Sequence, residues 1–146
     1  ETKLPKASEI LSLKGDVKQG KALIGRCYVC HKIGSAGVEF GPALAGWGSG
    51  QTREIILKSI LDPSAELSHG FEGTELIVKG DKKIQGFVQA EGDPLVVRVF
   101  GGQDLVIAKA DVKSRKQVKT SFMAPASRLG LDAQQLRDVV EYLKLN

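Results

Sequence analysis

The stretch that decides the fold is residues 74–109, TELIVKGDKKIQGFVQAEGDPLVVRVFGGQDLVIAK. It contains four short runs rich in β-branched and aromatic residues, and the turn-forming sequences GDK, EGDP and GG separate these runs. Residues 78–82 have the composition of a tight hairpin connection. Four consecutive strands joined by short turns predict an antiparallel β-meander, which we place at about residues 71–110.

Helix signals surround this β-segment. A capping residue precedes each of three amphipathic stretches: Asp16 before residues 17–27, Thr52 before residues 53–61, and Asp132 before residues 133–145. The second stretch is expected to stop at Asp62, because Pro63 disfavours a helical conformation in the residue before it. Residues 32–50 are rich in glycine and predict an irregular loop.

The composition is that of an ordinary folded domain. Of the 146 residues, 42% are hydrophobic and 26% are charged, which argues against a disordered chain. The net charge of +4 is small and the basic residues are scattered, so a nucleic-acid-binding protein is not expected. No apolar run approaches the roughly 18 residues that cross a bilayer. Aromatic residues make up only 5%, so we expect something besides the chain's own side chains to fill its centre.

The residues Cys27-Tyr28-Val29-Cys30-His31 form a C-x-x-C-H sequence, which is the attachment signature of c-type haem. At this spacing each thiol can add to one vinyl group of the porphyrin and form a thioether. The histidine that follows can then place an imidazole nitrogen on the iron. The motif therefore predicts a covalently bound haem with His31 as the proximal ligand.

Three other interpretations of the motif were weighed against haem. A zinc site needs about four ligands, and the chain offers only Cys27, Cys30, His31 and the distant His69. A thioredoxin-like redox pair follows a strand and opens a helix, whereas this pair is predicted to end a helix. The third interpretation is a chance occurrence in a compartment that keeps thiols reduced. Haem attachment is favoured over all three.

The second axial ligand is predicted to be Met123. It is the sole methionine and lies in a loop just before the last predicted helix, and His/Met ligation is common in electron-transfer cytochromes. The competing interpretation is a methionine that fills a gap in the core. His69 is the other candidate ligand, although a solvated loop histidine is the simpler interpretation of that residue.

With C-x-x-C-H, then Gly41-Pro42-Ala43-Leu44, then Met123 before a C-terminal helix, the chain resembles the monohaem cytochrome c family. More narrowly, it resembles the haem-binding domains of the Planctomycetes and Verrucomicrobia type. The likeness covers nearly the whole chain from Gly15 onward. Its matching segments are GKALIGRCYVCHKIG, GVEFGPALAGWGS, REIILKSILDPSAEL, the strand block and TSFM, of which SILDPSAE together with a β-insertion is the most specific.

The resemblance implies roles for several residues. Cys27 and Cys30 would form the thioethers, and the carbonyl of Pro42 would accept a hydrogen bond from the other ring nitrogen of His31. Gly20 would permit a close crossing of the first and last helices, with Tyr142 packing there. Trp47 and Arg53 have two open assignments. Both could face the haem propionates, or Trp47 could be a core side chain and Arg53 a solvated helix side chain. The sequence departs from the family where Ala124 separates Met123 from Pro125, which puts the position of the methionine loop in doubt.

The resemblance also implies a fold class and a domain organisation. The fold is expected to be a mainly α cytochrome c fold, with helices wrapped around the haem and an inserted antiparallel β-meander of about four strands. Residues 1–15 are expected to be a linker or an N-terminal extension, and residues 16–146 the cytochrome c domain. The abrupt start at Glu1 suits a domain excised from a longer chain.

The expected function is a non-enzymatic carrier of single electrons. The alternative is a haem-based ligand sensor or peroxidase-like enzyme with an open or displaceable distal position, in which His69 would be the available acid/base group. A third possibility is a binding module in which the β-insertion matters most. Expected partners are redox proteins, including a fused or associated dehydrogenase, and covalent haem attachment implies the bacterial periplasm. A basic stretch is a candidate partner face, although a solvated loop is the simpler interpretation of it: Lys113, Arg115, Lys116 and Lys119.

Overall fold

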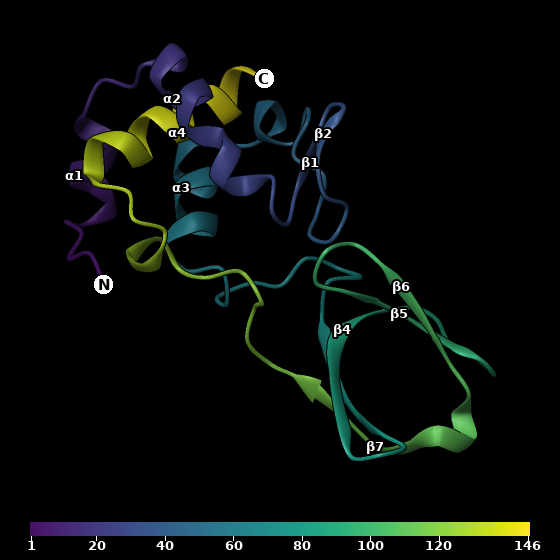
Figure 1. Ribbon diagram of the computed structural model, residues 1–146. Helices are drawn as coiled ribbons and strands as arrows, with labels where there is room; N and C mark the ends of the chain where they lie inside the picture. The colour runs from purple at the N-terminus through teal and green to yellow at the C-terminus, as the bar shows by residue number, and fades with distance from the viewer.

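The computed structural model describes all residues from 1 to 146. Its helices gather at one end of the molecule and a twisted sheet forms the other end (Figure 1). Both chain termini belong to the helical end. Loops connect the two parts, and the loop that leaves the last strand carries the chain back to the C-terminal helix.

Four short α-helices build the helical part. They are α1 (Ala7–Ser12), α2 (Val17–Leu23), α3 (Arg53–Leu61) and α4 (Ala133–Leu145). Three single turns of 3-10 helix accompany them: η1 (Ile24–Cys27), η2 (Gly48–Gly50) and η4 (Ala126–Arg128). A fourth, η3 (Lys109–Asp111), connects the last two strands at the sheet end. The three predicted N-caps are confirmed, because the side chains of Asp16, Thr52 and Asp132 each accept a hydrogen bond from a backbone N–H three residues ahead. The α3 helix also ends before Asp62, as Pro63 predicted.

The α2 and α4 helices cross at a glycine. A Cβ on Gly20 would collide with the carbonyl oxygen of Asp138 and would lie 2.8 Å from the Cβ of Tyr142, which confirms the predicted crossing. The core beside this crossing is apolar and includes residues such as Ile56 and Val140. Ile10 of α1 is fully buried in the same core. The α1 helix therefore packs against the rest of the helical part.

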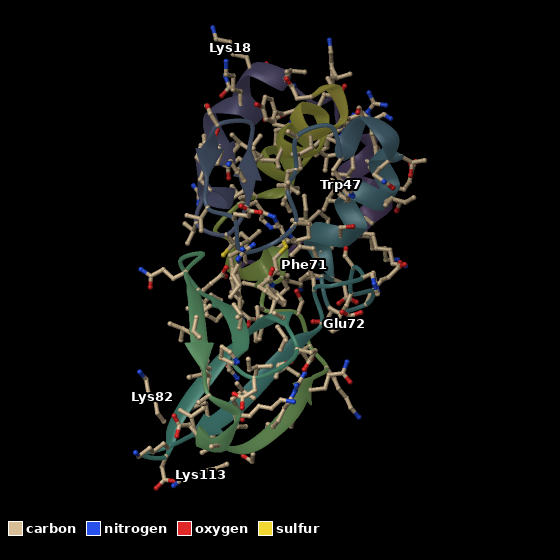
Figure 2. All side chains as sticks on the ribbon, turned by 90° about the vertical axis from the view of Figure 1, so that its right-hand side faces the viewer. Lys18, Trp47, Phe71, Glu72, Lys82 and Lys113 are labelled. Atoms are coloured by element: carbon tan, nitrogen blue, oxygen red, sulfur yellow. The ribbon has the colours of Figure 1, made fainter.

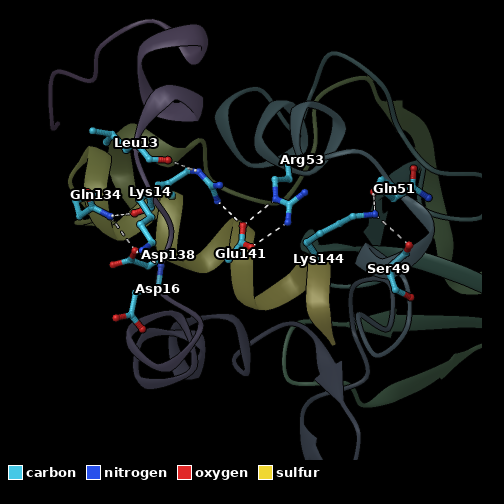
Figure 3. Close-up of polar contacts among 11 residues, drawn as sticks. Leu13, Lys14, Asp16, Ser49, Gln51, Arg53, Gln134, Asp138, Glu141 and Lys144 are labelled. Atoms are coloured by element: carbon cyan, nitrogen blue, oxygen red, sulfur yellow. Dashed lines mark hydrogen bonds and ion pairs between the residues drawn. The ribbon is translucent and has the colours of Figure 1, made fainter.

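A row of polar contacts runs along α4 (Figure 3). The buried carboxylate of Asp138 accepts a hydrogen bond from the backbone N–H of Asp16 at 2.9 Å. Less than one turn further, Glu141 binds Arg53 of α3 and Arg137 of its own helix, with closest N–O distances of 2.8 and 2.7 Å. These contacts fix α4 against the N-terminal segment and against α3.

The sheet has five antiparallel strands in the order β6-β5-β4-β3-β7. The strands are β3 (Gly73–Val78), β4 (Lys82–Ala90), β5 (Leu95–Val99), β6 (Asp104–Ile107) and β7 (Val112–Val118). The predicted hairpin at residues 78–82 is present, and its turn contains two residues with positive φ, Gly80 and Asp81. The sheet has its own small core around Leu76 and Val97. A further two-stranded ribbon, β1 (Lys32–Ile33) and β2 (Ala36–Gly37), lies inside the glycine-rich loop.

The predicted fold class, a mainly α cytochrome c fold with an inserted meander of about four strands, is wrong. The protein is a mixed α/β fold with 33% helix and 24% strand, and its sheet has five strands. The unpredicted strand is β7, whose Lys, Arg and Gln residues have the composition of a polar loop. β7 pairs only with β3 and most of its side chains are exposed, so this edge strand needs no apolar alternation.

None of the helices combines the length and the apolar character that crossing a membrane requires.

Candidate functional site

A cavity lies where the helical part meets the sheet. Its lining comprises 23 residues, of which 15 are hydrophobic. The lining includes all the residues singled out by the sequence as haem-binding: Cys27, Cys30, His31, Pro42 and Met123. Figure 2 shows sulfur atoms at this junction, between the labels of Trp47 and Phe71, two further lining residues. An apolar cavity with a few convergent polar groups is typical of a cofactor site.

The two cysteines lie at the end of the helical turn η1 and in the bend that follows it. Both are free thiols and both are partly buried. The backbone N–H of His31 donates to the carbonyl of Cys27 at 2.8 Å, which closes the motif into one compact turn. Burial raises the pKa of both thiols, and the neighbouring Cys30 raises that of Cys27 further. A catalytic redox pair has a lowered thiol pKa at a helix N-terminus, so the site does not have the character of a thioredoxin-like pair.

The imidazole of His31 is held by a single polar contact. Its Nδ1 lies 2.6 Å from the carbonyl oxygen of Pro42, which is the hydrogen bond that the resemblance to cytochromes c implies. The loop that supplies this carbonyl is itself fixed, because the N–H groups of Phe40 and Gly41 donate to the carbonyl of Cys30 at 3.2 and 2.6 Å. Burial lowers the pKa of His31, while the hydrogen bond to Pro42 acts in the opposite direction. With Nδ1 occupied, Nε2 is the ring nitrogen that remains for a metal.

Met123 enters the same cavity from the loop that joins β7 to η4. Its backbone N–H donates to the hydroxyl of Ser121 at 3.1 Å, and the N–H of Ser121 donates to the hydroxyl of Ser64 at 3.0 Å. Ala124 is exposed, and Pro125 caps the following turn η4. The fold therefore brings Met123 to the cavity that holds His31, although the two residues lie far apart along the chain.

The structure separates two further candidates from the cavity. His69 is exposed and does not line it. Arg53 does not line it either, because its guanidinium makes two hydrogen bonds to Glu141, at 2.8 and 2.9 Å. Trp47, by contrast, contributes to the lining and packs against the helical core. Arg53 is thus a partly exposed side chain paired with Glu141 and is not a cavity residue.

The sequence analysis missed a phenylalanine cluster beside the cavity. All five phenylalanines of the chain belong to it: Phe40, Phe71, Phe87, Phe100 and Phe122. Their ring centroids lie 4.6 to 6.1 Å apart in six pairs, and four of the rings line the cavity. The residues come from separate segments, so no local periodicity indicates that they meet. The only indication of this cluster in the sequence was that the chain has few other aromatic residues that could fill its interior.

The basic stretch proposed as a partner face is largely paired within the sheet. Lys113 binds Asp81 at 2.8 Å and Arg115 binds Glu91 at 2.6 Å. Lys116 lies 3.3 Å from Glu75. These pairs, one between β7 and β3 and two with residues of turns beside the sheet, offset much of the positive charge of the stretch.

The donor set fits a covalently bound haem. Two thiols, an imidazole with its Nδ1 fixed and a thioether all line one largely apolar cavity. No group of three or more His, Cys, Asp or Glu side chains is arranged to hold a metal ion. No known protein-family model matches the chain, and no curated protein matches it significantly.

Proposed function

We propose that this chain is a c-type cytochrome domain, which carries single electrons through one haem bound covalently at Cys27 and Cys30, with His31 and Met123 as axial ligands. The observation that carries the proposal is the shared cavity. It brings the C-x-x-C-H motif and the only methionine of the chain to one apolar site, from opposite ends of the sequence. The resemblance to monohaem cytochromes c supports the same function.

When bound, haem c supplies an iron centre that changes oxidation state by one electron. The chain's residues prepare the site for it. The Pro42 carbonyl fixes the orientation of the His31 ring and makes the free nitrogen a better metal ligand. The apolar lining, including Leu44 and Leu131, excludes water from the site. A thioether from Met123 in addition to the imidazole favours the reduced state and raises the reduction potential.

The alternative function is a haem-based sensor or a peroxidase-like enzyme with an open or displaceable distal position, and the peroxidase-like version also requires an acid/base group beside that position. His69 is the imidazole on which the peroxidase version depends, and it lies outside the cavity lining. Met123, in contrast, lies in that lining. The positions of these two residues favour the electron carrier.

The proposed electron donor is a dehydrogenase module, fused to this chain or associated with it, in the bacterial periplasm. The chain is expected to act as the acceptor and to have no enzymatic activity of its own. Substrate-driven reduction of the cytochrome within the full parent protein tests this part. If the substrate reduces the dehydrogenase module and the cytochrome stays oxidised, this donor is excluded.

The haem assignment is tested by exporting the chain to the periplasm of a host that has the cytochrome c maturation proteins. The denatured polypeptide is expected to keep the mass of one haem, and Cys27→Ser/Cys30→Ser is expected to lose it. The reduced wild-type protein is expected not to bind carbon monoxide. In Met123→Ala, carbon monoxide binding appears and the methionine-to-iron charge-transfer band of the oxidised protein is lost. A wild-type chain without covalent haem, or one that binds carbon monoxide readily, contradicts the proposal.

A further inference from the structure

The phenylalanine cluster lies on the path between the sheet and the methionine loop. Phe122 is the residue directly before Met123, and its ring packs against three other rings of the cluster. The centroid distances are 5.3 Å to Phe87 of β4, 5.4 Å to Phe100 after β5, and 6.1 Å to Phe40. The residue that precedes the proposed distal ligand is therefore held mainly by the sheet.

A contact with Gly73 of β3 also fixes the position of the Phe122 ring. Gly73, the first residue of β3, lies so close to Phe122 that a Cβ at position 73 would stand 2.6 Å from Cζ and 2.7 Å from Cε2. Gly73 also pairs with Val118 of β7, the strand that leads into the methionine loop. The absence of a side chain at position 73 lets the ring rest on the β3 backbone.

The cluster also reaches the segment that carries the other proposed ligand. Phe40 is almost completely buried, at 3% exposure, and its N–H donates to the carbonyl of Cys30 in the C-x-x-C-H motif. Its ring contacts both Phe87 and Phe122. One set of packed rings thus connects the His31 side of the cavity with the Met123 side.

The other contacts of the methionine loop are weaker anchors. The hydrogen bond from Ser121 to Ser64 is exposed and the one from Met123 to Ser121 is only partly buried, so water competes with the partners of both. Packed aromatic rings have no such competition, and their fit is sensitive to small changes in shape. The position of Met123 should therefore depend more on the cluster than on the serine contacts.

We infer that the sheet positions the distal methionine, with Phe122 and Gly73 as the positioning residues. The inference rests on the proposed function and adds a role for the five-stranded sheet, which a haem site does not itself require. It predicts that a change at Gly73, outside the cavity lining, alters the ligation by Met123.

The test compares Gly73→Ala and Phe122→Leu with wild type and Met123→Ala, all as haem-loaded full chains. Gly50→Ala is the matched glycine control, because a Cβ at position 50 has no atom within 4 Å. Each protein is examined for carbon monoxide binding in the reduced state, for the methionine-to-iron charge-transfer band when oxidised, and for its midpoint potential. Circular dichroism and covalently bound haem report whether each variant is folded and loaded.

Both positioning variants are expected to gain carbon monoxide binding, to lose most of the charge-transfer band and to shift to a lower potential, as Met123→Ala does. Gly50→Ala should behave as wild type. If Gly73→Ala does not fold, Phe122→Leu decides, since it removes atoms and adds no clash. If the wild type behaves as proposed and the folded variants still do not bind carbon monoxide, this inference alone is overturned. A wild type that itself binds carbon monoxide overturns the proposed function first, and this inference with it.

Discussion

Gly41 lies against the imidazole of His31, so that a Cβ at position 41 would stand 2.8 Å from Cε1 and 3.1 Å from Nδ1. On the same ring, Nδ1 lies 2.6 Å from the carbonyl oxygen of Pro42. A residue without a side chain therefore leaves room for the imidazole, and the carbonyl of the next residue fixes its orientation. Gly-Pro after the C-x-x-C-H motif thus has a steric role in addition to a hydrogen-bonding one.

Gly41→Ala is predicted to push the His31 ring away from Pro42. The added methyl must displace either the imidazole or the Cys30 carbonyl, which is 3.3 Å from the same position. Overpacking of this kind costs about 1–3 kcal/mol of folding free energy. Proton NMR of the protein without haem should show the hydrogen-bonded Nδ1–H resonance of His31 in wild type and in Gly50→Ala, and should show it lost or shifted in Gly41→Ala. An unchanged resonance would mean that the contact tolerates the methyl group.

Gly20→Ala is predicted to destabilise the helical part. Alanine favours a helix by about 1 kcal/mol over glycine, but here its Cβ would collide with the backbone carbonyl of Asp138 in α4. Separating two packed backbones disrupts their contacts, so a net loss of about 2 kcal/mol in the free energy of unfolding is expected. Thermal or urea unfolding measures it, with Gly50→Ala as the control. A Gly20→Ala protein as stable as wild type would contradict the close crossing of α2 and α4.

Local chemistry accounts for the parts of the fold that the sequence predicted. Asp16, Thr52 and Asp132 cap helices because a short polar side chain satisfies a free N–H wherever the helix packs. The turn at Gly80 and Asp81 likewise needs positive φ in any context. β7 could not be predicted in this way. Its partners are residues of other strands, as Lys116 and Glu75 show, and pairing between distant segments leaves no local pattern.

In the candidate site, too, contacts within one segment were predicted and several contacts between distant segments were not. The C-x-x-C-H motif and the Pro42 carbonyl are close in sequence, and their arrangement was predicted. The contact of Arg53 with Glu141 was not predicted, because the two residues lie 88 positions apart. The role of the sheet was also open, since Phe122 and Gly73 meet only after the whole sheet has formed. Contacts between distant segments thus account for what the sequence did not predict.

Arg115→Gln is predicted to have a small effect on stability. The ion pair of Arg115 with Glu91 is short, at 2.6 Å, but both side chains are largely exposed. Exposed pairs contribute about 0.2–1 kcal/mol, and salt screens them. Urea unfolding at low salt should show a loss within this range, and the difference should shrink at high salt. A larger loss that persists at high salt would mean that Arg115 has a packing role in β7.

Glu141 is predicted to make the stability of the protein depend on acidic pH. Hydrogen bonds from Arg53 are the largest cause that lowers the pKa of Glu141 from an ordinary value of 4.5 to about 2, and Arg137 adds to the effect, while burial opposes it. A carboxylate with a lowered pKa in the folded state contributes stability that is fully present above its unfolded pKa. This contribution is expected to fall progressively below about pH 4.5 and to be lost as the pH drops through about 2.

Glu141→Gln is therefore predicted to be less stable than wild type at pH 7, by on the order of 2 kcal/mol after allowance for the solvent that reaches Arg53. Unfolding free energies measured from pH 7 to pH 2 should converge for the two proteins, because protonated Glu141 and glutamine are both neutral. Glu54→Gln is the matched control, since Glu54 is exposed on α3 and is the weakest of the groups that act on Arg53. A difference between wild type and Glu141→Gln that stays constant down to pH 2 would show that packing, and not the two arginine contacts, makes Glu141 stabilising.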